Sequence, residues 1–363
     1  MLIYWSIFII LASGSLFNGQ SAPRGRWLFL LLAGVPITLM IGLRWKIGPD
    51  FGSYVLIFER TKLFSLSRAI YHQDPAFYVL NWLAHRMRAS LWELDLFCAA
   101  IFMGGLTAFS LRQPNPWISM LVAFPYLVIV VAMSGVRQSI AIGLLFFALN
   151  AYERNKLKLC TFIILVASLF HASAILMGPV CVLSHKERRF LGTILVPVFA
   201  LIGYLVLQES FDTYAGRYSQ GNLQSFGVWF RLAMNGIPAL IFLNYSRRFD
   251  LTGNQKSLWR NMSLLSLLAI PLAIAFPTTT AVDRFILYLF PMQFAVLSRV
   301  PAALSNALNG RIVLTLLIIV YAGAAQFTFL TLGTFADFYV PYNSIFGGDL
   351  PIAQYLRFFR RPA

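Results

Sequence analysis

One arginine stands between two long apolar stretches. Arg137 lies in segment 134–141, which reads Ser-Gly-Val-Arg-Gln-Ser-Ile-Ala, and no acidic residue is near it in the sequence. A guanidinium group donates hydrogen bonds in a planar fork that matches a phosphate group, so one interpretation is a binding site for a phosphate of the substrate. The alternative is an arginine at the membrane interface that reaches water or a lipid phosphate.

Further arginines stand in or beside apolar sequence. Arg217 precedes Tyr218 in a polar loop, and Arg231 lies inside an apolar run with no acid nearby. Arg284 follows Asp283 at the start of another apolar run, and these two can neutralise each other. Because a cation pathway would contain intramembrane Asp and Glu, which are few here, the pattern favours an anionic substrate.

One histidine and two aspartates are candidates for proton transfer. His171 divides a long apolar stretch between two basic loops. It is either a packing residue or a group that donates to phosphate or moves a proton. Asp50 follows a Gly-Pro pair and Asp74 precedes a proline. Each is therefore either a helix N-cap or a carboxylate available as a general base.

The acidic triplet Glu93-Leu94-Asp95 resembles a metal box only superficially. Positions i and i+2 of a helix do not share a face, and charges at a helix N-terminus explain both acids. No nucleotide-binding or hydrolase motif is found in the sequence. We therefore expect neither a metal nor a cofactor.

Membrane helices must position these groups. Of the 363 residues, 59% are hydrophobic and 12% are charged, and the mean hydropathy is +0.72. A soluble chain is about 25% charged, so a soluble protein and a disordered chain are both excluded. The composition predicts one all-α domain over residues 1–363, a polytopic bundle of about 11–13 transmembrane helices. The apolar runs are Leu2–Phe17, Trp27–Leu43, Leu94–Leu111, Trp117–Met133, Ser139–Tyr152, Leu159–Phe170, Ala172–Leu183, Phe190–Leu207, Phe226–Asn244, Leu258–Phe276, Phe285–Ser298 and Ile312–Leu332.

Two segments are not simple spans. Residues 44–90 mix charges with aromatic residues, which predicts interfacial amphipathic helices on the periplasmic side that make no net crossing. Residues 333–363 are rich in Gly, Pro and Tyr, which predicts an ordered C-terminal loop or lid.

The distribution of charge predicts the orientation. Lys and Arg number 29 against 13 Asp and Glu, a net charge of +16. Short basic loops that face the cytoplasm account for this excess, so no nucleic-acid partner is expected. In that orientation the candidate residues share the outer face, which predicts an outward-facing cavity lined by them. They are Asp50, Asp74, Arg137, His171, Arg217, Asp283, Arg284 and Tyr342.

The ordered set of motifs resembles the EpsG family of exopolysaccharide polymerases, relatives in role of the Wzy-type repeat-unit polymerases. The resemblance rests on G-x-D-x-x-x-Y over Gly48–Tyr54, an acidic-Pro-small-aromatic box at Asp74–Phe77, V-R-Q-x-x-A over Val136–Ala141 and F-H-x-S-A over Phe170–Ala174. Arg217-Tyr218, Arg284 and Pro341-Tyr342 add support. The second box departs from the family pattern, with Asp74 where Glu is more common and Ala76 where Gly is.

The resemblance implies a metal-independent membrane glycosyltransferase in the style of the GT-C enzymes. Such an enzyme joins oligosaccharide repeat units carried on a polyprenyl diphosphate, at the outer face of the bacterial cytoplasmic (inner) membrane. The bilayer and the lipid-linked oligosaccharide would be its partners, together with a chain-length regulator and a flippase. The implied catalytic residues are Asp50, Asp74 and His171, and the implied substrate-binding residues are Arg137, Gln138, Arg217, Tyr218, Arg231, Arg284, Tyr54 and Tyr342.

Three other functions stay open at this point. A flippase or other transporter would favour matched halves with broken helices, which the sequence does not display. An O-antigen-type ligase would use the same donor with a different acceptor. A membrane O-acyltransferase would need a His–acid pair on the correct face.

Overall fold

The chain is built from helices. The computed structural model describes residues 1–16, 23–185, 187, 227–275 and 280–347, and all the regular secondary structure in these ranges is helical. The helices are α1 (Leu2–Leu16), α2 (Pro23–Phe29), η1 (Leu30–Gly34), α3 (Val35–Gly42), α4 (Phe51–Thr61), α5 (Leu66–Ile70), α6 (Pro75–Arg86), α7 (Leu91–Ser110), α8 (Pro116–Ala123), η2 (Phe124–Ala132), α9 (Val136–Glu153), α10 (Leu157–Phe170), η3 (Ala172–Leu176), α11 (Met177–Ser184), α13 (Gly227–Tyr245), α14 (Gly253–Ala275), α15 (Thr280–Leu297), α16 (Val300–Leu304), α17 (Leu308–Phe327), η5 (Thr328–Leu332), η6 (Ala336–Phe338) and η7 (Ile345–Gly347).

The apolar runs of the sequence coincide with these helices, which confirms the all-α prediction. Among the described residues, Leu91–Ser110, Gly253–Ala275 and Leu308–Leu332 are long and apolar enough to cross a membrane. Shorter apolar helices accompany them at Leu2–Leu16, Trp27–Gly42, Pro116–Ala132, Leu157–Phe170 and Ala172–Ser184. The run predicted at Phe190–Leu207 lies outside the described residues.

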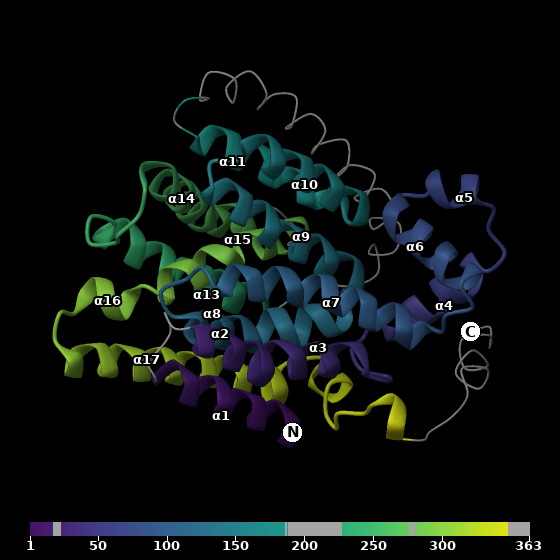
Figure 1. Ribbon diagram of the computed structural model, residues 1–363, viewed down its shortest axis with the longest axis horizontal. Helices are drawn as coiled ribbons and strands as arrows, with labels where there is room; N and C mark the ends of the chain where they lie inside the picture. The colour runs from purple at the N-terminus through teal and green to yellow at the C-terminus, as the bar shows by residue number, and fades with distance from the viewer. Residues whose placement is uncertain (17–22, 186, 188–226, 276–279, 348–363) are drawn as a thin grey trace.

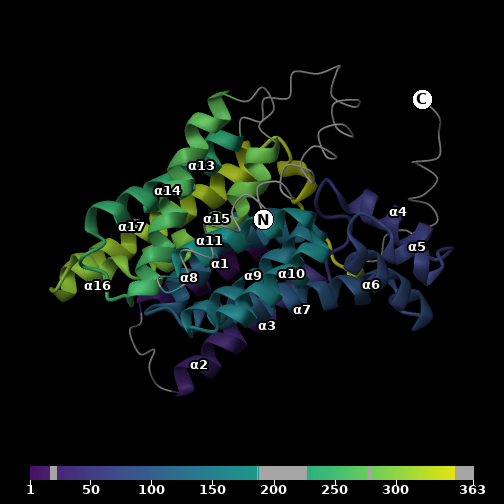
Figure 2. The same ribbon diagram turned by 90° about the horizontal axis from the view of Figure 1, so that it is seen from above.

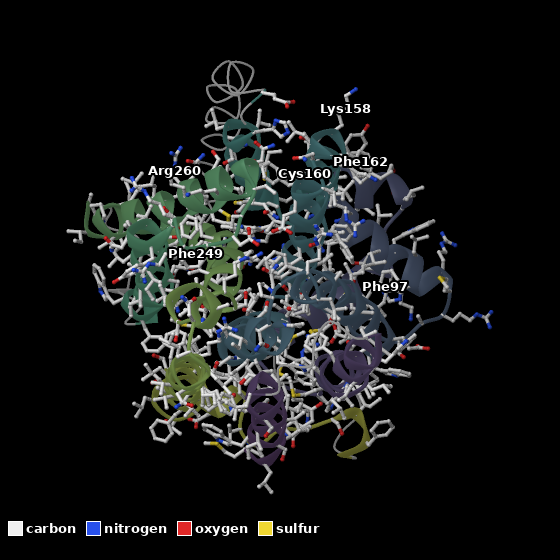
Figure 3. The ribbon with its side chains drawn as sticks, turned by 60° about the vertical axis from the view of Figure 1, so that its left-hand side comes forward. Phe97, Lys158, Cys160, Phe162, Phe249 and Arg260 are labelled. Atoms are coloured by element: carbon white, nitrogen blue, oxygen red, sulfur yellow. The ribbon has the colours of Figure 1, made fainter. Side chains whose placement is uncertain are left out.

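The outer surface of the bundle is apolar, as contact with lipid requires. Phe162 on α10 is 62% exposed and Phe97 on α7 is 52% exposed. Cys160, two residues before Phe162, is buried. Figure 3 shows both phenylalanines on the outside of the helices, with Cys160 on the inner side of α10. In water such exposed apolar surface would be unfavourable, so it identifies the chain as a membrane protein.

Helix α9 packs against α7 and α10, and small residues allow the closest of these approaches. A Cβ atom added to Gly105 of α7 would lie 2.0 Å from the carbonyl oxygen of Gly143 on α9. Glycine at both positions therefore lets the two backbones meet, as small residues do at helix contacts in membranes.

The short helices α4, α5 and α6 lie together at one end of the bundle, and both views agree (Figures 1 and 2). Helix α16 lies at the opposite end. Helix α9 runs between the two ends for 18 residues, or about 27 Å. Helix α6 has 12 residues, about 18 Å, which is shorter than the hydrocarbon core of a bilayer.

The segment from Gly333 to Gly347 is fastened to the chain before α4. The Gly48 N–H donates to the Phe338 carbonyl at 2.9 Å, and the Trp45 N–H donates to the Asn343 carbonyl at 3.0 Å. The described part of the predicted loop or lid is therefore ordered against this turn. Residues 348–363 lie outside the described part.

Candidate functional site

Arg137 and Asp74 form an ion pair at the end of the bundle that carries α4–α6. Arg137 stands at the second position of α9, and Asp74 directly precedes α6. Their Nη1 and Oδ2 atoms are 2.6 Å apart, and the two side chains are 31% and 8% exposed. The pair joins residues that are 63 positions apart in the sequence and fixes the start of α6 to α9.

Asp74 is held by more than the arginine. Its side chain makes no capping hydrogen bond to α6, although it occupies the N-cap position, so the simple N-cap interpretation does not hold. A hydrogen bond from the backbone of Ala172 also reaches the carboxyl group. Burial raises the pKa of Asp74, and the Arg137 guanidinium acts against that rise. Asp74 thus ties α6, α9 and the turn after α10 together.

Tyr54 completes the surroundings of Arg137. Its hydroxyl accepts a hydrogen bond from the backbone N–H of Arg137 at 3.3 Å. Its ring packs edge-on against Phe77 with centroids 5.7 Å apart. The Nε atom of Arg137 is buried and has no hydrogen-bond partner among the described residues. Such an unsatisfied donor is costly, and an anionic oxygen would satisfy it.

Asp50 is held by a neutral group. The Ser134 hydroxyl donates to Oδ2 of Asp50 at 2.9 Å, and Asp50 itself is exposed. Asp50 precedes α4 but makes no side-chain capping hydrogen bond. Its carboxylate therefore keeps accepting capacity toward solvent or a substrate.

The turn that carries Asp50 fits closely against residues 133–134. Gly48 has a φ of +87°, and a Cβ added there would lie 2.9 Å from the Met133 carbonyl oxygen. That same oxygen accepts a hydrogen bond from Nε of Arg44 at 2.7 Å, and Arg44 forms a buried ion pair with Asp95 at 3.4 Å. Only glycine combines this φ with this close approach, so the turn is fixed in place.

His171 lies in the turn between α10 and η3. Its Nδ1 atom is 3.2 Å from the Tyr288 hydroxyl, and Tyr288 is fully buried on α15. Burial lowers the pKa of His171, and the positive charges of Arg284 and Arg137 lower it further. The imidazole is therefore neutral at physiological pH, and it can donate a hydrogen bond through one ring nitrogen but cannot act as a cation.

The remaining arginines differ in their partners. Arg231 binds Asp283 through Nε–Oδ1 at 3.0 Å and Nη2–Oδ2 at 2.5 Å. Asp283 therefore pairs with Arg231, whereas the sequence offered the adjacent Arg284 as its partner. The Arg284 carbonyl accepts a hydrogen bond from Gln138 Nε2 at 3.3 Å, so the start of α15 lies beside that of α9.

Tyr342 packs in a different set of residues. Its hydroxyl donates to the Met40 carbonyl at 2.8 Å, and its ring meets Tyr4 edge-on at 5.9 Å. These contacts fasten the 333–347 segment to α1 and α3. Arg217 and Tyr218 lie outside the described residues.

The acids of the 93–95 triplet have separate structural roles. Glu93 accepts hydrogen bonds from the backbone N–H and the hydroxyl of Ser90, at 2.7 and 2.6 Å, which is a capping box. Asp95 pairs with Arg44, as described above. No three His, Cys, Asp or Glu residues in the described part of the chain gather as metal ligands would.

The fold and the site together define a polytopic membrane protein whose ionisable groups converge at one end of a helical bundle. Residues 27–344 match the model of the EpsG family. The chain therefore belongs to the EpsG family, the family of Wzy-type polymerases, and is a polysaccharide-biosynthesis membrane protein. The resemblance stated from the motifs is confirmed. No curated protein and no solved structure matches the chain.

Three residues of the site were not found from the sequence. Ser134 holds Asp50, Tyr288 contacts His171, and Arg44 supports the residues beside Ser134. Ser134 stands in the same motif as Arg137, and a polar residue at the end of an apolar run could have indicated a site residue. Tyr288 lies inside an apolar run and offered no such indication.

Proposed function

We propose that this protein polymerises oligosaccharide repeat units carried on a polyprenyl diphosphate, acting as a membrane glycosyltransferase without a metal. Membership of the EpsG family supports this class of reaction. The observation that carries the proposal is the meeting of Arg137, Asp74, Tyr54 and the turn after His171 at one end of the bundle. Cation, carboxylate and neutral hydrogen-bonding groups together suit a diphosphate donor and a hydroxyl acceptor.

The arginines serve the leaving group. When the bond from the anomeric carbon to the diphosphate oxygen breaks, negative charge grows on the polyprenyl diphosphate. Arg137, with its unsatisfied Nε, and Arg284 at the start of α15 would stabilise that charge. Neutral His171 would add a hydrogen bond to it. Arg231 acts indirectly in this scheme, because Asp283 already binds two of its nitrogens.

Asp50 is the general base of the proposal. Oδ2 of Asp74 is bound by the Arg137 guanidinium and the side chain is 8% exposed, so Asp74 has little access to an acceptor hydroxyl. Asp50 is exposed, and among the described residues the side chain that donates to its carboxylate is the Ser134 hydroxyl. It would take the proton of the acceptor sugar hydroxyl as that oxygen bonds to the anomeric carbon and polyprenyl diphosphate departs. Asp74 would position Arg137.

We infer that the site faces the periplasm or cell exterior of the cytoplasmic membrane. Arg154 follows the end of α9 that is remote from Arg137, and Lys158 stands near the end of α10 that is remote from His171. Positive charge near short loops favours the cytoplasm, so the opposite end would lie outside. Lipid-linked repeat units would be supplied there by a flippase.

Reconstitution of the purified protein in vesicles with lipid-diphosphate repeat units tests the proposal. Wild type should yield a ladder of polymer and release one polyprenyl diphosphate for each new linkage. Arg137→Ala should lose the ladder and remain folded, with a lower unfolding temperature because it breaks the ion pair with Asp74. Lys158→Ala, which removes a cation at the other end, should keep the ladder. Transport without diphosphate release would instead indicate a flippase. Transfer only to an acceptor that is not a repeat unit would indicate a ligase.

A further inference from the structure

Three aromatic rings lie nearly parallel around the short helices α5 and α6: Phe64 precedes α5, His72 follows it and Tyr78 lies on α6. The ring of His72 stacks on Tyr78 with centroids 3.5 Å apart and an angle of 21°. Phe64 is parallel to Tyr78 within 8°, at 6.1 Å, and lies 6.3 Å from His72. We call Phe64, His72 and Tyr78 the aromatic platform.

The platform adjoins the candidate active site through the backbone. His72 is two residues before Asp74, and the backbone N–H of Tyr78 donates to the Asp74 carbonyl at 3.2 Å. Arg137 and Asp74 are both close enough to influence the charge of His72. Helix α5, which Phe64 and His72 flank in the sequence, stands farther from the bundle than α6 (Figure 1).

The platform differs from ordinary core packing in its exposure. Tyr78 is buried, Phe64 is half-buried and His72 is exposed. If the only role of these rings were to join α5 to α6, all three side chains would be expected to be buried. Arg68 lies over the Phe64 ring, 4.4 Å from its centroid, and adds a hydrogen-bond donor beside the platform.

His72 is neutral and has a defined tautomer. Burial lowers its pKa, the charges of Arg137 and Arg68 lower it further, and Asp74 only partly opposes them. The backbone N–H of Gln73 donates to Nδ1 of His72 at 2.9 Å. The ring proton of the neutral form is therefore on Nε2, which becomes a donor for a ligand.

The exposed ring of His72, with Phe64 and the Arg68 guanidinium beside it, suits a sugar ring. The C–H bonds of a pyranose carry partial positive charge and are attracted to the negative face of an aromatic ring. The hydroxyls of the sugar accept hydrogen bonds from groups such as a neutral imidazole N–H.

We propose that the aromatic platform binds a sugar ring of the oligosaccharide substrate, as a subsite beyond the diphosphate-binding part of the site. This inference rests on the proposed function for the identity of the oligosaccharide. The saccharide would leave the Arg137–Asp74 pair along α6 and α5 and be held by stacking. Stacking tolerates varied hydroxyl patterns, so the subsite would supply affinity without strict selectivity for one sugar.

The test measures binding without catalysis. The probe is a mixture of oligosaccharides released by mild acid from the exopolysaccharide of the source organism, which carry no lipid diphosphate. Saturation-transfer NMR on the full-length protein in detergent should show contact with sugar C–H groups in wild type. Loss of one stacking ring should weaken binding by about three- to ten-fold, so Phe64→Ala and His72→Ala should both show this drop.

Matched variants separate stacking from general damage. His72→Phe keeps a flat ring and should retain most of the affinity. Tyr71→Ala removes the neighbouring ring, which is 89% exposed and outside the platform, and should bind as wild type. Lys158→Ala, which removes a cation near the far end of α10, should also bind the lipid-free probe as wild type. Thermal unfolding of each variant verifies that it is folded.

The outcomes distinguish the two proposals. If wild type binds no oligosaccharide, or if folded Phe64→Ala and His72→Ala bind as wild type, the platform is not a sugar subsite even when polymer is made. If the platform variants lose binding while no polymerisation is ever detected, the subsite stands and the polymerase proposal fails.

Discussion

Replacement of each aspartate by asparagine would decide which carboxylate is the base. Asp50→Asn removes an exposed carboxylate that is held by the Ser134 hydroxyl. Loss of a general base typically slows a reaction by about 10²–10⁴-fold. We expect a rate loss in that range and little change in stability, because the side chain is exposed and similar in size.

Asp74→Asn should behave differently because it breaks an ion pair. The two side chains are 8% and 31% exposed, so the pair lies between exposed pairs, which contribute about 0–1 kcal/mol, and buried pairs, whose disruption costs about 3–5 kcal/mol. A cost of about 1–3 kcal/mol follows from those bounds. If all of it appears as misplacement of Arg137, the rate falls by about 5–150-fold. The thermal unfolding temperature should also fall.

The pH dependence of the polymerisation rate separates the two roles. A carboxylate base acts only when it is deprotonated, so the wild-type rate should rise with pH through the pKa of the base and then level off. Asp74→Asn should keep that rise at a lower rate, and Asp50→Asn should lose it. Initial rates of polyprenyl diphosphate release, measured over the widest pH range in which the protein stays folded, provide the measurement. A pH rise that persists in Asp50→Asn and vanishes in Asp74→Asn would assign the base to Asp74 instead.

Three further substitutions test the supports of the site. Ser134→Ala removes a hydrogen bond to the Asp50 carboxylate and should slow polymerisation by about 10–100-fold. Ser134→Thr keeps a hydroxyl and should retain activity. Equal rates for the two variants would mean that this hydrogen bond does not support Asp50. Gly48→Ala places a Cβ 2.9 Å from a carbonyl oxygen at a φ of +87°, and thermal unfolding should show a destabilisation of about 1–3 kcal/mol. Gly347→Ala is the control, because nothing lies within 4 Å of its Cβ, and it should leave the unfolding temperature unchanged. Gly105→Ala should lower the unfolding temperature because its Cβ would lie 2.0 Å from a backbone atom of α9. Gly104→Ala should not, because its nearest contact is a side chain at 3.6 Å. Equal unfolding temperatures of the two variants would mean that α7 and α9 can separate freely.

The helical architecture could be predicted because it depends on local composition. Apolar runs must form helices in lipid, where every backbone polar group needs an internal partner. The Gly-Pro-Asp turn and the Asp-Pro helix start could also be predicted from the sequence, since proline favours the first position of a helix. The boundaries of α4 and α6 follow from these signals.

The pairing of charges could not be predicted from the sequence. Asp283 and Arg284 are adjacent, yet consecutive positions on a helix point about 100° apart, and Asp283 pairs with Arg231, 52 residues away. The partnership of Arg137 with Asp74 likewise depends on how α6 docks on the bundle. The predicted topology placed the aspartates and the arginines at the same outer face, but only tertiary packing decides which carboxylate pairs with which guanidinium.

The segment that follows α17 completes the surroundings of the Gly48 turn late in synthesis. The Gly48 turn, synthesised early, gains its Phe338 partner only when the ribosome has added nearly all of the described chain. A nascent or truncated product would lack this fastening, so the turn that carries Asp50 would be held less firmly.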